Sequence, residues 1–208
     1  MKVSIIGYGN MGTSLAQALV RAGHQVTLTG RSHDKATVAA EKTKSRALPA
    51  SEAAKDAEII IATTPYDSQV SSLKSLGDLS GKVVIDISNP LKPDMSGLQI
   101  GHSTSAAEEI AKQLPGVKVI KAFNTVFAQV LQEGSQFKNG KAQVFYAGDE
   151  EAAKTKVKSL IESMGFEATD AGPLANSRYL EPMGMLNIWF GYMAKKGTGI
   201  APAWINRG

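Results

Sequence analysis

Short hydrophobic runs alternate with helix-like segments over the first 170 residues of the chain. Continuous apolar triplets, such as Ile-Ile-Ile at 59–61 and Val-Val-Ile at 83–85, are typical of strands buried on both faces of a sheet. Strands that alternate with helices in this way indicate a parallel sheet wrapped by helices. The pattern therefore predicts an α/β fold of the Rossmann type with a doubly wound, mostly parallel sheet.

The predicted elements follow one another closely, as βα units with short connections do. Strands are expected at residues 2–6, 25–29, 46–48, 58–63, 82–87, 117–122, 143–147 and 167–170. Helices are expected at residues 11–22, 34–42, 51–55, 67–75, 105–114 and 150–164.

Strand character is lost from residue 174 to residue 196, and residues 183–193 within this stretch form a segment that is apolar nearly all round. Its apolar residues are Met183, Met185, Leu186, Ile188, Trp189, Phe190, Tyr192 and Met193. A helix without a polar face must be covered, either by its own domain, by a second subunit or by a flat ring over which it forms a lid. We therefore divide the chain into a dinucleotide-binding Rossmann domain (1–125) and a part (126–208) that continues strand–helix–strand and ends in a helical segment forming an acceptor pocket or dimer contact.

Composition narrows the functional classes. With 208 residues, 43% hydrophobic and 20% charged, the chain suits one α/β core with a small appendage. The absence of Cys excludes disulfides, thiol redox chemistry and Cys-bound metals, so any redox chemistry needs a cofactor. No apolar run reaches the roughly 18 residues of a membrane span, which favours a cytoplasmic protein without a membrane partner. The net charge of +4 is mild, and residues 31–46 carry five basic against two acidic side chains. This excess predicts a local anion site and no nucleic-acid partner.

A glycine motif, Gly-Tyr-Gly-Asn-Met-Gly at 7–12, lies between the first strand and the first helix. Gly7 permits the tight turn, Gly9 lets the backbone approach a pyrophosphate, and Gly12 lets the helix pack on the strand. The helix N-terminus offers free amides and a positive dipole end to phosphates. The motif predicts dinucleotide binding.

The end of the second strand predicts which dinucleotide is bound. An acidic residue would accept hydrogen bonds from the ribose of NAD, but the sequence there reads Thr29-Gly30-Arg31-Ser32, followed by Lys35. Arg31 and Lys35 can hold a 2′-phosphate by charge-assisted bonds, and Ser32 can donate its hydroxyl. The sequence therefore predicts NADP(H) as the cofactor.

Two further loops follow later strands, at Thr63, Thr64 and Pro65 and at Asn89. Ligands of doubly wound folds bind beyond the carboxyl ends of the strands, so these loops are expected to line the cofactor crevice. The three His residues have no recognisable carboxylate partner or metal-ligand spacing, and we assign no catalytic side chain and no metal ligand. Direct hydride transfer between two stacked rings needs neither.

Three segments carry a family resemblance: Val-Ile-Lys-Ala-Phe-Asn-Thr at 119–125, Ser-Ala-Ala-Glu-Glu at 105–109 and Asp-Ala-Gly-Pro-Leu-Ala-Asn-Ser-Arg at 170–178. The chain resembles the NADP-dependent oxidoreductases of the deazaflavin coenzyme F420 from Lys2 to its C-terminus. It is also similar to the cytoplasmic oxidoreductase domain of the Steap metalloreductases.

The resemblance implies roles for individual residues. It places Tyr8, Asn10 and Met11 on the pyrophosphate, and Arg31 and Lys35 on the 2′-phosphate. It also implies that Thr64 and Pro65 lie beside the nicotinamide, Asn124 and Thr125 beneath it, and the acceptor ring against the C-terminal segment.

The chain departs from the deazaflavin enzymes at two positions. Gly30 stands where that family often has Ser, which leaves Thr29 and Ser32 for the phosphate. Asn124 replaces a His and matches the Steap version. Three acceptors therefore stay open: deazaflavin, an ordinary flavin (FMN or FAD), and a ferric or cupric chelate reduced through flavin. Two alternative functions also stay open for the chain: a pyrroline-5-carboxylate reductase-like enzyme and a non-catalytic NADP-binding sensor.

Gly197 and Gly199 allow the end of the chain to turn back sharply, which would carry Trp204 towards the acceptor ring. We expect a homodimer in which this tail closes the interface and forms one wall of the acceptor pocket.

Overall fold

The computed structural model describes residues 1–205 and residue 207. Its main sheet contains β1 (Lys2–Ile6), β2 (Gln25–Thr29), β3 (Arg46–Ala47), β4 (Ile59–Ala62), β5 (Val83–Asp86), β6 (Lys118–Ala122), β9 (Gln143–Gly148) and β10 (Glu167–Asp170). The strand order is β10-β9-β6-β5-β4-β1-β2-β3. All neighbours pair parallel except β6 and β9, which are antiparallel. The predicted doubly wound, mostly parallel sheet is confirmed.

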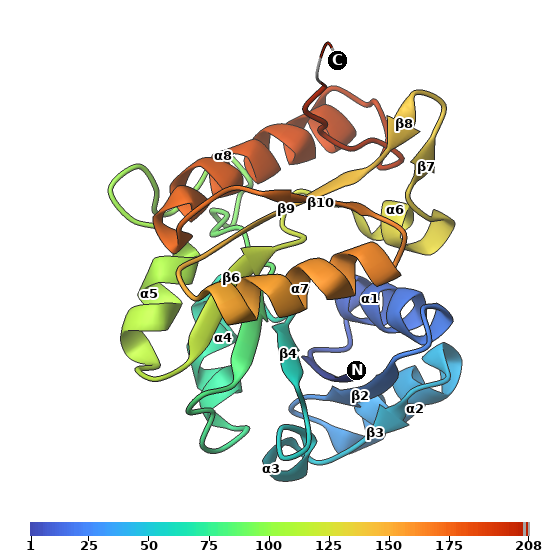
Figure 1. Cartoon of the computed structure of the whole chain (residues 1–208), viewed down its shortest axis with the longest axis vertical. Helices are drawn as coiled ribbons and strands as arrows, with labels where there is room; N and C mark the ends of the chain where they lie inside the picture. Colours follow the sequence, from blue (N-terminus) through green and yellow to red (C-terminus); the bar gives the residue numbers. More distant parts are fainter. Residues whose placement is uncertain (206, 208) are drawn as a thin grey trace.

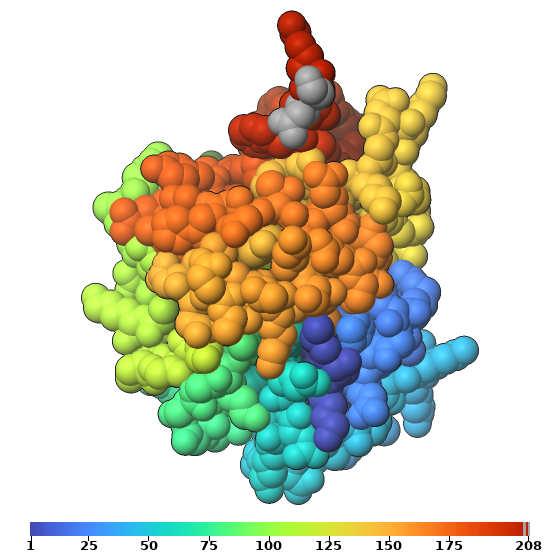
Figure 2. Space-filling view, in the orientation of Figure 1, coloured from blue at the N-terminus to red at the C-terminus, as the bar shows by residue number. Residues whose placement is uncertain are grey.

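Helices pack on both faces of this sheet (Figure 1). One face carries α1 (Asn10–Arg21), α2 (His33–Thr43), α6 (Ala128–Glu133) and α7 (Glu151–Ser163); the other carries α3 (Ala50–Ala53), α4 (Tyr66–Lys74), α5 (Ala106–Gln113) and α8 (Ser177–Ile188). Figure 2 shows α7 in orange across the middle of one face and the C-terminal segment in red above it. This layering explains why the central strands are apolar on both sides.

The C-terminal segment begins with the 3-10 turn η1 (Leu174–Asn176), continues as α8 and ends in the π-helical turn η2 (Trp189–Met193). Leu180 of α8 packs with Phe145 and Ala147 of β9. The opposite side of the helix is open to solvent in the single chain, where Leu186 is 52% and Trp189 47% exposed. The chain's own domain therefore covers only part of this apolar segment.

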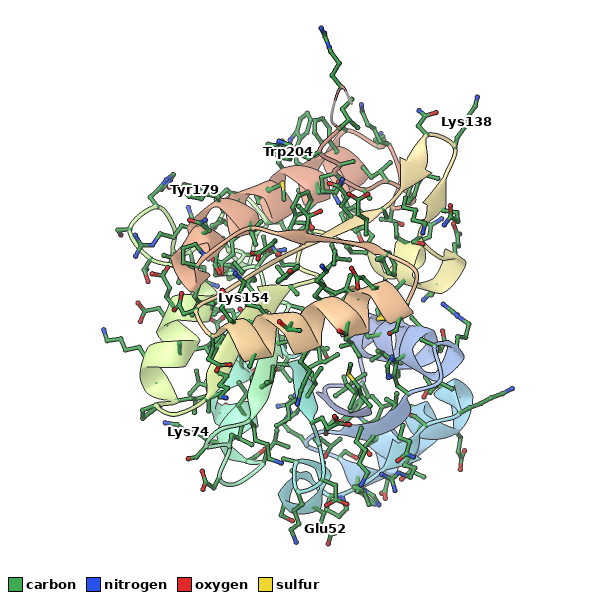
Figure 3. The ribbon with its side chains drawn as sticks, in the orientation of Figure 1. Glu52, Lys74, Lys138, Lys154, Tyr179 and Trp204 are labelled. Carbon is green, nitrogen blue, oxygen red and sulfur yellow. The ribbon has the colours of Figure 1, made fainter. Side chains whose placement is uncertain are left out.

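Three features differ from the sequence-based expectation. Helix α6 and the hairpin of β7 (Gln136–Phe137) and β8 (Gly140–Lys141) are additional elements, too short to show a period in the sequence. Trp204 does not line the crevice: its ring packs edge-on against Phe145 at 6.1 Å, and its backbone bonds with Gln143 at the start of β9. In Figure 3, Trp204 and Tyr179 both lie on the α8 side of the molecule.

The domain boundary at residue 125 falls in the connection between β6 and α6, inside a structure whose sheet is continuous. The two-part division therefore stays a prediction. No helix among residues 1–205 is both long enough and apolar enough to cross a bilayer.

Candidate functional site: a dinucleotide crevice

The glycine turn joins β1 to α1 at the point where the strand order reverses between β1 and β4. Gly7 has a φ of +115°, and a Cβ there would collide with Thr63. A Cβ on Gly12 would collide with the Gly7 carbonyl and lie 2.8 Å from the Thr63 hydroxyl. A Cβ on Gly9 would meet nothing within 4 Å. Gly7 and Gly12 therefore serve packing, whereas Gly9 leaves open space in front of the helix.

Two cavities open on either side of this turn. The first, which we call the Arg31 cavity, has a volume of about 530 Å³; the second, the Asn124 cavity, has about 220 Å³. The Arg31 cavity is lined by Ile6, Gly7, Tyr8, Gly9, Gly30, Arg31, His33, Pro49, Ala50, Thr63, Thr64, Pro65, Ser68, Ser72 and Ser75. The Asn124 cavity is lined by Asn10, Met11, Ile87, Asn89, Leu91, Met95, Phe123, Asn124, Thr125, Val126, Phe127, Ala128, Gly184, Asn187, Ile188 and Tyr192. The structure thus divides most of the predicted cofactor residues between the two cavities, whereas Gly12, Thr29, Ser32 and Lys35 line neither.

Arg31 and His33 provide polar groups on the wall of the Arg31 cavity. The Ser32 hydroxyl accepts a hydrogen bond from the Lys35 amide at 3.3 Å and so caps α2. Lys35 is exposed on the first turn of that helix, whereas Thr29 is buried and its hydroxyl has no partner among the residues that the structure describes. Arg31 is therefore the predicted phosphate ligand that lies directly on the cavity.

Gly30 makes room for the ring of Tyr8. A Cβ at position 30 would lie 2.6 Å from Tyr8 Cε1, too close for any real contact. The Tyr8 hydroxyl also accepts a hydrogen bond from the Ser32 amide at 3.3 Å. The glycine that departs from the deazaflavin family is thus explained by the aromatic ring beside it.

Part of the wall of the Asn124 cavity is formed by Asn89 and Asn124, which are hydrogen-bonded to each other. Asn89 Nδ2 donates to the Asn124 carbonyl at 2.8 Å, and Asn124 Nδ2 donates to Asn89 Oδ1 at 2.9 Å. Asn124 Nδ2 also donates to the Leu180 carbonyl at 2.8 Å, which ties the pair to α8. The preceding residue, Phe123, is fully buried with a φ of +61°, so its fixed, strained backbone turns Asn124 into the site.

Helix α8 reaches this wall because of Gly184. A Cβ on Gly184 would lie 2.6 Å from Asn89 Oδ1 and 2.9 Å from the Asn124 carbonyl. One turn later, Asn187 Nδ2 donates to the Thr125 carbonyl at 3.1 Å. Sequence reasoning missed Gly184 and Asn187; the only signal was a small and a polar residue inside an otherwise apolar segment.

Among the residues that line the two cavities, three buried polar atoms have no partner in the described part of the chain: Thr64 Oγ1, Asn124 Oδ1 and Thr125 Oγ1. Buried polar groups normally have a partner, so these atoms indicate a polar ligand. The first turn of α1 also contains no acidic residue to compete with a phosphate. Together with the open space at Gly9, these features fit a dinucleotide with a carboxamide at one end.

The described residues do not form a metal-binding cluster, and two of the three histidines line neither cavity. Among residues 1–205 and 207, no three His, Asp or Glu side chains lie close enough to hold a metal ion. His24 contacts the N-terminal amine and Ser163, far from the crevice, and His102 has a φ of +60° in a loop. His33 alone of the histidines lines one of the two cavities.

Fold and crevice define a Rossmann-type nucleotide-binding protein, and the comparisons specify its family. Residues 2–90 match the family described as NADP oxidoreductase, coenzyme F420-dependent. A relative is metalloreductase STEAP3 of Rattus norvegicus, 35% identical over 191 residues, which cover 90% of this chain and 38% of the relative. The nucleotide-binding part of the chain, residues 2–90, thus matches this NADP oxidoreductase family, and 90% of the chain is similar to the Steap enzyme, which confirms the resemblance inferred from the sequence.

Solved structures agree with this assignment. An Arthrobacter sp. protein provisionally described as an F420-dependent NADP-reductase is 28% identical, with a TM-score of 0.83 and 96% of each chain covered. A Sinorhizobium meliloti protein of undefined function is 29% identical, with a TM-score of 0.77 over 85% of this chain and 87% of its own. An Aspergillus terreus reductive aminase in complex with NADPH4 shares only the fold, at 18% identity, a TM-score of 0.68 and coverage of 93% and 62%. The chain spans less than half the length of STEAP3.

The three motif glycines should separate folding from binding. We expect Gly9→Ala to leave the melting temperature unchanged and to weaken NADPH by about tenfold or more, because its methyl group enters the space in front of the helix. Gly12→Ala should lower the melting temperature, because its methyl group collides with the β1 turn. Thermal unfolding and calorimetric titration measure both effects.

Gly97→Ala is the matched control, since a Cβ there also meets nothing within 4 Å and Gly97 lines neither cavity. It should change neither quantity. If Gly9→Ala bound NADPH as tightly as the unaltered protein, the pyrophosphate assignment would be wrong.

Proposed function

We propose that the chain is an NADPH-dependent oxidoreductase that passes hydride to a flavin or deazaflavin ring. The observation that carries this proposal is the character of the Asn124 cavity. Among the described residues that line this cavity, Tyr192 alone has a titratable side chain; the others contribute amides, a hydroxyl, apolar side chains and the rings of Phe123 and Phe127. Such a pocket suits two stacked planar rings and supplies little acid–base chemistry.

Bound NADPH would supply the hydride, and the side chains would hold the two rings. Arg31 is the charged group for the 2′-phosphate, and the amides that begin α1 face the pyrophosphate. Asn124 Oδ1 and the hydroxyls of Thr64 and Thr125, which have no partner among the described residues, would bond the carboxamide. Held at contact distance, two rings exchange hydride without a side-chain base.

The acceptor would lie on the α8 side of the Asn124 cavity. Ile188 and Tyr192 form that wall, and Tyr192 packs edge-on against Phe127 at 5.8 Å between ring centroids. A flat aromatic ring can be covered by such side chains while its other face meets the nicotinamide. Trp204, which packs on Phe145, has no part in this pocket.

We also propose that α8 and η2 form a homodimer contact. Tyr179, Leu186, Trp189 and Met193 are exposed by 72%, 52%, 47% and 41%, and follow one another at helical spacing. An apolar stripe of this kind is unusual on a monomer surface. Because the same segment forms the wall of the Asn124 cavity, a dimer would fix that wall.

The dimer is tested by sedimentation velocity. We expect the unaltered chain to sediment as a dimer and Leu186→Asp as a monomer, because a buried unpaired charge is strongly disfavoured. Lys74 is exposed at the C-terminal end of α4, so Lys74→Asp changes the charge elsewhere and should leave the dimer intact. A monomeric unaltered protein would refute the dimer without affecting the proposed reaction.

Cofactor choice is tested at Arg31. A hydrogen bond to a charged group contributes about 1.5–3 kcal/mol, so Arg31→Ala should weaken NADPH by about ten- to a hundredfold. NADH lacks the 2′-phosphate and should bind nearly as before. Lys138→Ala, at the exposed turn between β7 and β8, is the matched loss of a positive charge and should affect neither cofactor. Equal losses for both cofactors at Arg31→Ala would overturn the assignment.

The acceptor is identified by following NADPH oxidation with a panel of FMN, FAD, coenzyme F420 and ferric chelates with and without flavin. We expect turnover within the usual range of about 1–1,000 per second for one ring acceptor, with ferric reduction dependent on added flavin. Pyrroline-5-carboxylate belongs in the same panel, and its reduction alone would replace our proposal. Tight NADPH binding with no turnover on any acceptor would instead indicate a sensor.

A further inference from the structure

A buried ion cluster lies where β5, β6 and α8 meet. Lys121, Asp86 and Glu181 are all fully buried. Lys121 Nζ lies 2.6 Å from Asp86 Oδ2 and 2.7 Å from Glu181 Oε1, and it donates to the Ser88 carbonyl at 2.7 Å. All three donor positions of the ammonium group are therefore used.

Both carboxylates of the cluster are surrounded by donors. Asp86 Oδ1 accepts from Gln69 Nε2 and from the Ser88 amide, each at 2.8 Å. Glu181 Oε2 accepts from the Ala106 amide at 3.0 Å, at the start of α5. Burial holds the pKa of Glu181 above its usual value, although Lys121 and the Ala106 amide oppose the shift. Each carboxyl group also accepts from Lys121 and from a backbone amide, contacts that favour its charged form, and the fully ionised cluster consists of two carboxylates and one ammonium.

This cluster lies directly behind the wall of the Asn124 cavity. Ser88, which bonds Lys121, is flanked by Ile87 and Asn89, and both of these line the cavity. Gly184, also on the cavity, follows Glu181 by less than one helical turn. The ionised cluster has a formal charge of −1. This charge is buried next to segments that line the site we propose for the nicotinamide, and the positive end of the α5 dipole offsets it only in part.

We propose that this buried negative charge favours the oxidised cofactor and so makes bound NADPH a stronger hydride donor. Loss of hydride leaves the nicotinamide ring with a positive charge, whereas the ring of NADPH is neutral. A fixed negative charge behind the site attracts only the charged form. The inference rests on the proposed NADP(H) site, but it does not depend on which acceptor is used.

The effect is large enough to measure. Two unit charges about 10 Å apart at an effective dielectric constant of about 20 change a binding constant by about tenfold. The cluster is shielded from solvent, so salt screens it less than a surface charge. Structural damage would affect both cofactor forms, whereas loss of charge changes the ratio of their affinities.

The test measures dissociation constants for NADP⁺ and NADPH by calorimetry in the unaltered protein and in Glu181→Gln and Asp86→Asn. Each substitution removes one negative charge from a different end of the cluster. We expect the unaltered protein to bind NADP⁺ more tightly than NADPH. In both variants NADP⁺ should lose about tenfold more affinity than NADPH.

Gly184→Ala is the control for a displaced helix, because its methyl group pushes against Asn89 without changing any charge. It should weaken both forms equally. Unchanged affinity ratios in the charge variants would overturn the inference; so would tighter binding of NADPH than NADP⁺ by the unaltered protein, which settles the matter even if neither variant folds. Failure of the unaltered protein to bind either form would instead refute the proposed function.

Discussion

The ammonium group of Lys121 is the contact on which the geometry of the crevice depends. It binds Asp86 at the end of β5 and Glu181 on α8, while Glu181 also caps α5 through the Ala106 amide. Four elements that are distant in the sequence therefore meet at one charged cluster. Removal of one partner from a buried pair typically costs about 3–5 kcal/mol, because the other charge is left uncompensated. In a chain without cysteine, this cluster fixes α8 against the sheet.

From that fixed point, close packing determines the shape of the cofactor site. Glu181 holds the start of α8, and Gly184 lets the next turn approach Asn89 and Asn124. At the opposite end of the crevice, the absence of a Cβ at Gly30 likewise leaves space for the Tyr8 ring. The two glycines thus allow their neighbours to pack closely beside the cavities, while the polar side chains around them are held by hydrogen bonds. A preformed site of this kind loses little entropy when a ligand binds.

The sequence predicted the features that follow from local patterns. Apolar strands, the glycine turn and the basic residues after β2 each have a short-range signature, and the doubly wound sheet followed from them. The strained turn at Phe123 and the approach of Gly184 depend on residues about 60 positions apart, and no local pattern reports such contacts. The predicted position of Trp204 was wrong for the same reason. Its place is determined by packing on Phe145 and not by the two glycines that precede it.

Helix α8 also shows why an apolar pattern does not reveal which side of a helix is buried. Its buried side carries Glu181, Gly184 and Asn187, which are needed to bond the sheet and the loop after β6. Its exposed side carries Leu186, followed in η2 by Trp189. A globular protein normally arranges these residue types the other way round. The polar contacts help to hold the helix to its own domain, so Leu186 and Trp189 stay exposed in the single chain. In the dimer that we propose, the same helix would form the wall of the Asn124 cavity with one side and contact the partner with the other.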